Sequence, residues 1–114
     1  MKDWKNQAVL SVTTTVGSLP EAQALARDLL GQRLAACVQV QPGLGSHYRW
    51  QGVLCEDPEV RLTIKTVPAC MPALQTWFEL HHPYQLPQLL VSEMAASVAY
   101  AQWVRAETSP AHPG

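Results

Sequence analysis

The sequence predicts an α+β fold in which helices cover one face of a β-sheet. Three observations support this prediction. Residues 8–16 and 37–67 are rich in β-branched residues and partly alternate in polarity, as strands do. Residues 18–30 repeat apolar side chains at helical spacing, and prolines bracket a second helical segment at residues 69–81. The order β-α-β-β-α-β, followed by a short terminal helix, is that of a ferredoxin-like sandwich.

The first helix has the clearest start signal in the chain. Ser18 can cap it, Pro20 suits its first turn, and Glu21 stands at the third position of a capping box. Behind this cap, the apolar stripe consists of Ala22, Leu25, Ala26, Leu29 and Leu30. We therefore expect this helix to cover the sheet through that stripe.

A long hairpin is predicted next. Period-two alternation begins at Cys37, Pro42-Gly43 predicts a bulge or kink, and Gln51-Gly52 predicts the turn. The returning strand runs to Val67. Each strand would have roughly 15 residues, against the ~5–6 of a typical strand. Strands that extend beyond their own domain usually pair with another chain, so we expect an oligomer.

The hairpin also predicts the character of the sheet face that the helices leave open. The side chains expected there are Cys37, Gln39, Arg61, Thr63 and Lys65. This mixed polarity is typical of a wet subunit interface or of a ligand cleft.

Three further segments complete the prediction. Residues 86–91 predict the last strand, and a short helix is expected to end at about Glu107. Residues 108–114 have nothing to pack against, so we expect a loose tail. The 114 residues form a single domain with an ordered core at about residues 8–107.

Composition excludes several classes of protein. A net charge of −1 without a basic patch argues against a nucleic-acid partner, and no apolar run approaches the ~20 residues of a membrane helix. Residues 1–7 lack the apolar stretch of a secretory signal, so a cytoplasmic location is expected. Three cysteines without CxxC spacing are most simply free thiols there.

Four short motifs, in this order and spacing, resemble those of the CutA divalent-cation-tolerance family. They are Leu34-Ala35-Ala36-Cys37, Tyr48-x-Trp50-x-Gly52, Lys65-Thr66 and His82-Pro83-Tyr84-x-x-Pro87. The resemblance covers roughly residues 8–107. It implies a compact homotrimer with sheets facing inward and interlocking hairpins, similar in architecture to the PII signalling proteins.

The chain departs from the family pattern at several places. Gly17 stands where a proline is common, Gln39 replaces a common asparagine or threonine, and Arg49 replaces an aromatic residue. Residues 91–97 lack the usual Leu-Pro and are about one residue short. Gly17 is expected to loosen the first turn. The short segment at residues 91–97 affects the last strand, the edge contact between subunits and the entry to the final helix, but not the overall fold.

Two residues are the candidate metal ligands. A Cys37 thiolate would be a soft ligand for copper, and a neutral His82 imidazole binds copper or zinc, although a helix C-terminus also favours the charged ring. The alternatives are a small buried residue for Cys37 and a helix-capping residue for His82. If the two share a site, further ligands must come from other subunits, from Glu93 or Glu59, or from water.

Other residues have weaker signals. Tyr48, Trp50, Tyr84 and Trp103 are predicted interface aromatics. Lys65 and Arg61 could contact an anion, although a solvated lysine at a strand end is an equal alternative. His47 is an extra ligand or an exposed residue, and His81 a bystander. Cys55 and Cys70 are interpreted as incidental, with Cys70 packed in the second helix.

These observations favour a binding protein over an enzyme, because Cys37 has no evident base and no oxyanion-hole signature. The first hypothesis is a cytoplasmic trimer that responds to divalent metal ions and binds copper or another divalent ion at Cys37 and His82. The alternative is a PII-like regulatory module with a small-molecule or anion site between subunits. No organic cofactor is expected. Only the first hypothesis requires Cys37.

Overall fold

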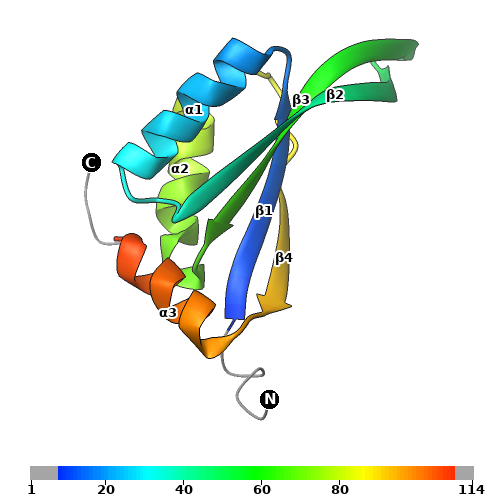
Figure 1. Cartoon of the computed structure of the whole chain (residues 1–114). Coiled ribbons are helices and arrows are strands. Elements are labelled where there is room, and N and C mark those ends of the chain that lie inside the picture. The colour runs from blue at the N-terminus through cyan, green and yellow to red at the C-terminus, as the bar shows by residue number, and fades with distance from the viewer. Residues whose placement is uncertain (1–7, 110–114) are drawn as a thin grey trace.

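The computed structural model of the chain describes residues 8–109. Its elements are β1 (Ala8–Val16), α1 (Leu19–Gly31), β2 (Cys37–Trp50), β3 (Val53–Thr66), a 3-10 turn (Pro68–Cys70), α2 (Met71–His81), β4 (Leu90–Ala95) and α3 (Val98–Glu107). The strands form one antiparallel sheet in the order β2-β3-β1-β4, and α1 and α2 cover one face of it (Figure 1). The predicted α+β ferredoxin-like order is confirmed. No helix in the described part of the chain is long and apolar enough to cross a membrane.

The capping signal of α1 forms as predicted. Ser18 Oγ accepts a hydrogen bond from the Glu21 amide at 3.3 Å, and a Glu21 carboxylate oxygen accepts one from the Gly17 amide at 3.4 Å. The buried core between the helices and the sheet consists of Val12, Leu29, Leu34, Ala35, Ile64, Leu74, Trp77 and Phe78. Asp28 links the two helices, because its carboxylate accepts a hydrogen bond from the Trp77 indole at 2.7 Å.

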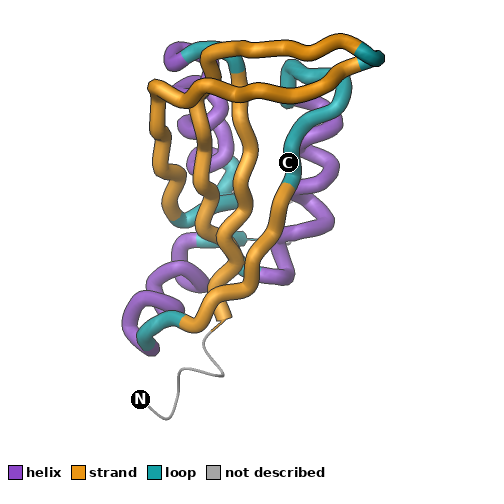
Figure 2. The backbone as a smooth tube through the Cα atoms, turned by 90° about the vertical axis from the view of Figure 1, so that its right-hand side faces the viewer, coloured by secondary structure: helices purple, strands orange, loops and turns teal. Residues whose placement is uncertain are grey.

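The predicted hairpin is also confirmed. β2 and β3 pair from Cys37 opposite Lys65 to Trp50 opposite Val53, with a register shift between Gln41 and Leu44 where Pro42-Gly43 stands. The outer part, residues 44–59, projects beyond the rest of the sheet and is called the arm below (Figures 1 and 2). Gln51 and Gly52 both have positive φ angles, 48° and 81°, as a tight hairpin turn requires.

The last strand begins later than predicted. We expected a strand at residues 86–91, whereas β4 runs from Leu90 to Ala95 and pairs with β1 from Thr13↔Leu90 to Ala8↔Ala95. Pro87 explains part of the error, since a proline has no amide to donate to a sheet ladder. Residues 83–89 instead form a connecting segment that passes the base of the arm.

The C-terminal segment is anchored further than expected. We predicted that residues 108–114 have nothing to pack against, but Thr108 is buried and its hydroxyl donates to the Val104 carbonyl at 3.0 Å. The Ser109 amide donates to the Arg33 carbonyl at 2.9 Å. Residues 110–114 lie outside the described residues.

Candidate functional site

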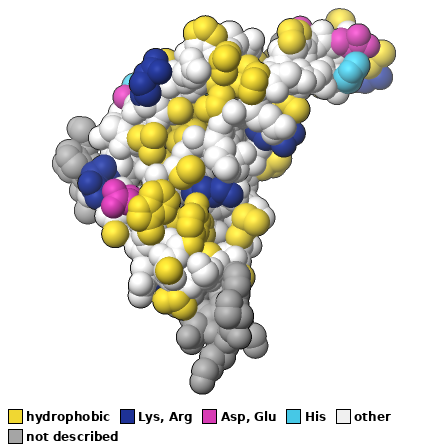
Figure 3. All heavy atoms as spheres, viewed as in Figure 1, with side chains coloured by type: hydrophobic (Ala, Val, Ile, Leu, Met, Phe, Trp, Pro, Cys, Tyr) yellow, Lys and Arg dark blue, Asp and Glu magenta, His cyan; other side chains and the backbone are white. Residues whose placement is uncertain are grey.

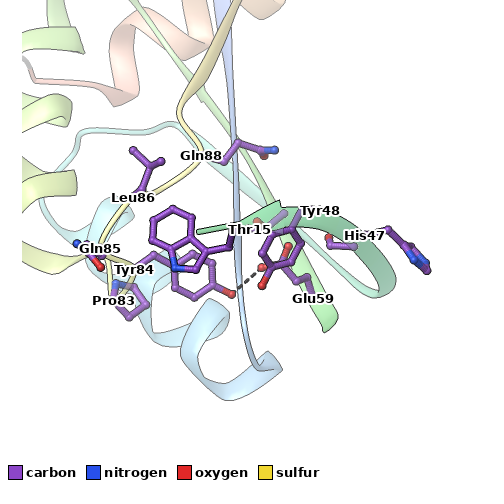
Figure 4. Close-up of a pocket in the computed structure, with 11 residues that line it drawn as sticks. Thr15, His47, Tyr48, Glu59, Pro83, Tyr84, Gln85, Leu86 and Gln88 are labelled. Atoms are coloured by element: carbon purple, nitrogen blue, oxygen red, sulfur yellow. Dashed lines mark hydrogen bonds between the residues drawn. The ribbon is translucent and has the colours of Figure 1, made fainter. Parts of the chain in front are cut away.

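A cavity of about 670 Å³ lies where the base of the arm meets the segment after α2, and we call it the arm cavity (Figure 4). Its lining comes from β1, from both strands of the arm and from the connecting segment. The lining residues are Thr15, Ser46, His47, Tyr48, Trp50, Glu59, Pro83, Tyr84, Gln85, Leu86 and Gln88. The volume is in the range of ordinary small-molecule sites.

Two tyrosines on its wall are held by carboxylates. The Tyr84 hydroxyl donates to Glu59 at 2.6 Å, as Figure 4 shows, and the Tyr48 hydroxyl donates to Asp57. Burial and the bond to Glu59 raise the pKa of Tyr84. The bond to Asp57, more than any other cause, raises the pKa of Tyr48 to about 12. Both phenols therefore remain neutral donors near pH 7.

His82 lies directly behind this wall and is only 8% exposed. Its Nδ1 accepts a hydrogen bond from the Tyr84 amide at 3.1 Å, and its Nε2 lies 2.9 Å from the Thr14 hydroxyl. An acceptor Nδ1 requires that the neutral ring carries its proton on Nε2, so His82 donates to Thr14. The ring also stacks on Phe78, with centroids 5.5 Å apart. Both ring nitrogens are thus engaged within the protomer.

Burial decides the charge state of His82. It lowers the pKa of this histidine below the ordinary 6.5, and it outweighs a hydrogen bond to the Thr15 backbone and the carboxylates of Glu21 and Glu59, which favour the charged ring. The expectation that the end of a helix favours the protonated form is therefore not met here. Removing the protonated ring from solvent disfavours it more than the nearby carboxylates stabilise it.

A single protomer does not bring Cys37 and His82 together. Cys37 pairs with Lys65, which pairs with Ser11, so these three side chains share the open face of the sheet. Thr14, the partner of His82, lies three positions beyond Ser11 and points to the helix-covered face. Within residues 8–109, no group of three or more histidine, cysteine or acidic residues could hold a metal ion. A shared metal site stays a prediction that needs residues from another copy.

The other predicted residues divide between two regions. Lys65 and Arg61 lie on the open face and do not line the arm cavity. His47 does line it and faces Glu56 across the hairpin at 3.3 Å. His81 is exposed beside the Trp77 ring.

The predicted interface aromatics are exposed in one protomer. Tyr48, Trp50 and Tyr84 are 37–43% exposed on the cavity wall, whereas Trp103 lies on α3 beside Tyr100. Their role between subunits stays a prediction. All three cysteines are free, and Cys70 is buried in the 3-10 turn before α2 rather than within the helix.

Sequence reasoning did not identify Thr14 or the cavity role of Glu59. Thr14 is 1% exposed between the buried Val12 and Val16 of β1. A polar residue on the buried side of an apolar strand needs a partner, so this position was a signal that could have pointed to His82.

Fold and site together define a class: an α+β protein of ferredoxin-like topology with a long projecting hairpin and a ligand-sized cavity at its base. The family model described as "CutA1 divalent ion tolerance protein" matches residues 10–107. The chain therefore belongs to the CutA family of divalent-cation tolerance proteins.

Relatives of this chain agree with that assignment. The divalent-cation tolerance protein CutA of Thermus thermophilus is 40% identical over 98 residues, covering 85% of this chain and 95% of its own. The structure of CutA from Synechococcus elongatus has a TM-score of 0.85 at 40% identity, covering 90% and 92% of the two chains. That protein has also been solved in complex with Bis-Tris, with a TM-score of 0.80, 39% identity and coverage of 88% and 93%. CutA from Nostoc sp. PCC 7120, described as PII-like, has a TM-score of 0.82 at 29% identity, covering 88% and 97%.

Proposed function

We propose that this protein contributes to divalent-cation tolerance as a cytoplasmic homotrimer that acts by binding rather than by catalysis. Membership of the CutA family supports the role in tolerance. Three free thiols suit the reducing cytoplasm. The number of subunits follows the resemblance to the family, while the surface of the chain supports self-association.

The exposed edges of the sheet are the observation that carries this proposal. β2 and β4 are both edge strands. Every residue of β4 is exposed, including Leu90 (60%), Val91 (48%) and Met94 (47%). Leu54, at 72% exposure, adds apolar surface near the end of the arm, where Figure 3 also shows charged side chains. Exposed apolar edge strands are rare in monomers, so pairing between copies of the chain is the simplest way to bury them.

Light scattering on the eluting protein tests the assembly. We expect three times the chain mass of 12.6 kDa. Lysines at Leu90 and Val91 should dissociate the assembly, whereas Leu80→Lys, an exposed position on α2, should leave it intact. A wild-type protein that elutes as a monomer at micromolar concentration contradicts the proposal.

For the metal, we propose copper bound through the Cys37 thiolate, with His82 as the second ligand. Cys37 is half-buried beside Lys65 on the open face, where copies of the chain can approach it, and thiolates favour Cu(I). His82 would have to exchange its Thr14 hydrogen bond for the metal. Competitive titration of the reduced protein with Cu(I), Cu(II) and Zn(II) tests this. Saturable binding that is lost in Cys37→Ser supports the proposal, and binding unchanged in that variant rejects it.

A second candidate function is a small-molecule binding module of the PII type. The arm cavity favours it, because the cavity has the size and the mixed lining of a ligand site. The Bis-Tris complex of the Synechococcus relative and the PII-like description of the Nostoc relative support it as well. This function should tolerate Cys37→Ser and should depend on cavity residues. Lys65 and Arg61, outside the cavity, remain candidates for a separate anion contact.

A further inference from the structure

Aromatic rings form much of the wall of the arm cavity. Tyr48, Trp50 and Tyr84 each line it, and each keeps 37–43% of its surface exposed. Their rings reach the cavity from two parts of the chain, the arm and the segment after α2. Aromatic faces have a negative quadrupole and attract cations, the indole of tryptophan most strongly.

The charged groups on the cavity wall also favour a cation. Glu59 lines the cavity, and none of the described lining residues is a lysine or an arginine. His47, the other titratable side chain on the wall apart from the tyrosines, faces the Glu56 carboxylate. Arg61 is not part of the lining, but it stands directly opposite Thr15, which is, so it is the nearest basic residue of the sheet to the cavity. The lining itself, with one carboxylate and no lysine or arginine, therefore favours a cation over an anion.

Hydrogen bonds hold two of the rings in place. Tyr84 donates to Glu59 at 2.6 Å and Tyr48 donates to Asp57 (Figure 4 shows the first). His82 fixes the backbone of Tyr84 by accepting its amide. A phenol that donates to a carboxylate is polarised toward the ring, which makes its face a better partner for positive charge. The wall is thus arranged before any ligand arrives.

We propose that the arm cavity binds a small organic cation, an alkylammonium or quaternary ammonium group, against the rings of Trp50 and Tyr84 and close to the Glu59 carboxylate. This inference rests on the second candidate function, the small-molecule module, and specifies the class of its ligand. A cavity of about 670 Å³ leaves room for further polar groups, which Gln85 and Gln88 are placed to bind.

Calorimetry on the assembled protein tests the proposal with two compounds of the same shape. Choline carries a quaternary ammonium, and 3,3-dimethylbutan-1-ol replaces its nitrogen with carbon. We expect choline to bind about tenfold more tightly than the neutral alcohol. Trp50→Leu should weaken choline binding by about tenfold. Leu80→Ala, which removes an exposed apolar side chain on α2 outside the cavity lining, is the control and should change nothing.

Two further variants separate charge from folding. Glu59→Gln should reduce the preference for choline over the alcohol, and Tyr84→Phe, which keeps the ring, should weaken choline by only about two- to threefold. Equal affinity for the two compounds overturns the proposal. Preferential binding of phosphate or acetate in the cavity also overturns it but leaves the binding module standing. If a screen of cations, anions and neutral compounds finds no binding that Trp50→Leu weakens, both the ligand class and the module are rejected.

Discussion

Replacing Thr14 with valine should destabilise the fold through a single hydrogen bond. The substitution keeps the shape of the side chain and removes the oxygen to which His82 Nε2 donates at 2.9 Å. Thr14 is 1% exposed and His82 8% exposed, so water cannot replace the lost partner freely. An unsatisfied buried donor costs about 1–3 kcal/mol. Because the Tyr84 amide still bonds to Nδ1 and the ring still stacks on Phe78, we expect the lower half of that range.

Denaturant unfolding at about pH 8 and at one fixed chain concentration measures this cost. A double-mutant cycle with His82→Phe isolates the interaction, since phenylalanine keeps the ring that stacks on Phe78. We expect a coupling free energy of about 1 kcal/mol, with the double variant less unstable than the two single losses added together. Thr63→Val, on the open face of β3, is the control and should change stability by less than about 0.5 kcal/mol.

Two results would refute the reasoning. If Thr14→Val costs no more than the Thr63 control, the hydroxyl does not hold His82. If the two substitutions are simply additive, each affects stability through separate contacts, and the Nε2–H assignment of the ring has no support.

Three other substitutions or conditions give direct tests. Because burial lowers the pKa of His82 in the folded protein, the neutral ring contributes its full stability above about pH 6.5. As the pH falls from there through the folded-state pKa of His82, the free energy of unfolding should decrease by at most about 1.4 kcal/mol per pH unit for each chain. His82→Phe should flatten this part of the profile of unfolding free energy against pH. Asp28→Ala removes the acceptor of the Trp77 indole and should cost about 1–2 kcal/mol in denaturant unfolding, whereas a cost below about 0.5 kcal/mol argues against that link between helices. Gly52→Ala forces an alanine to φ 81° and should lower the free energy of unfolding by about 1 kcal/mol. Gly31→Ala, at the end of α1 with open space around it, is the control and should be neutral or stabilising. Equal effects of the two substitutions in denaturant unfolding contradict this account of the turn.

The parts of the fold that sequence predicted best are those set by local chemistry. The Ser18 cap and the Gln51-Gly52 turn each depend on residues a few positions apart, and both form as expected. The start of β4 was wrong because it depends on where β1 offers unpaired groups, and no local pattern around Pro87 contains that information. Thr108 was misjudged for the same reason, because it is buried at the end of α3, where Ser109 bonds to the loop after α1.

The candidate site shows a similar limit. The motif that begins at His82 marked this residue as important, but the sequence could not show which atoms its two nitrogens contact. The arm cavity was not predicted at all, since it forms only when residues 46–50 and 83–88 fold against each other. Periodicity describes the face of an element, whereas a cavity depends on the distance between elements.

The same geometry changes how a metal experiment on His82 must be interpreted. His82→Ala removes a possible ligand, but it also releases the Tyr84 amide and one wall of the arm cavity, so a loss of copper binding in that variant has two explanations. Thr14→Val separates them, because it leaves the imidazole in place and removes the hydrogen bond that competes for Nε2. If His82 is a copper ligand, Thr14→Val should bind copper as tightly as the wild type or more tightly. If copper binding falls in Thr14→Val as it does in His82→Ala, then His82 supports the site by positioning the segment after α2, and ligation by its imidazole is rejected.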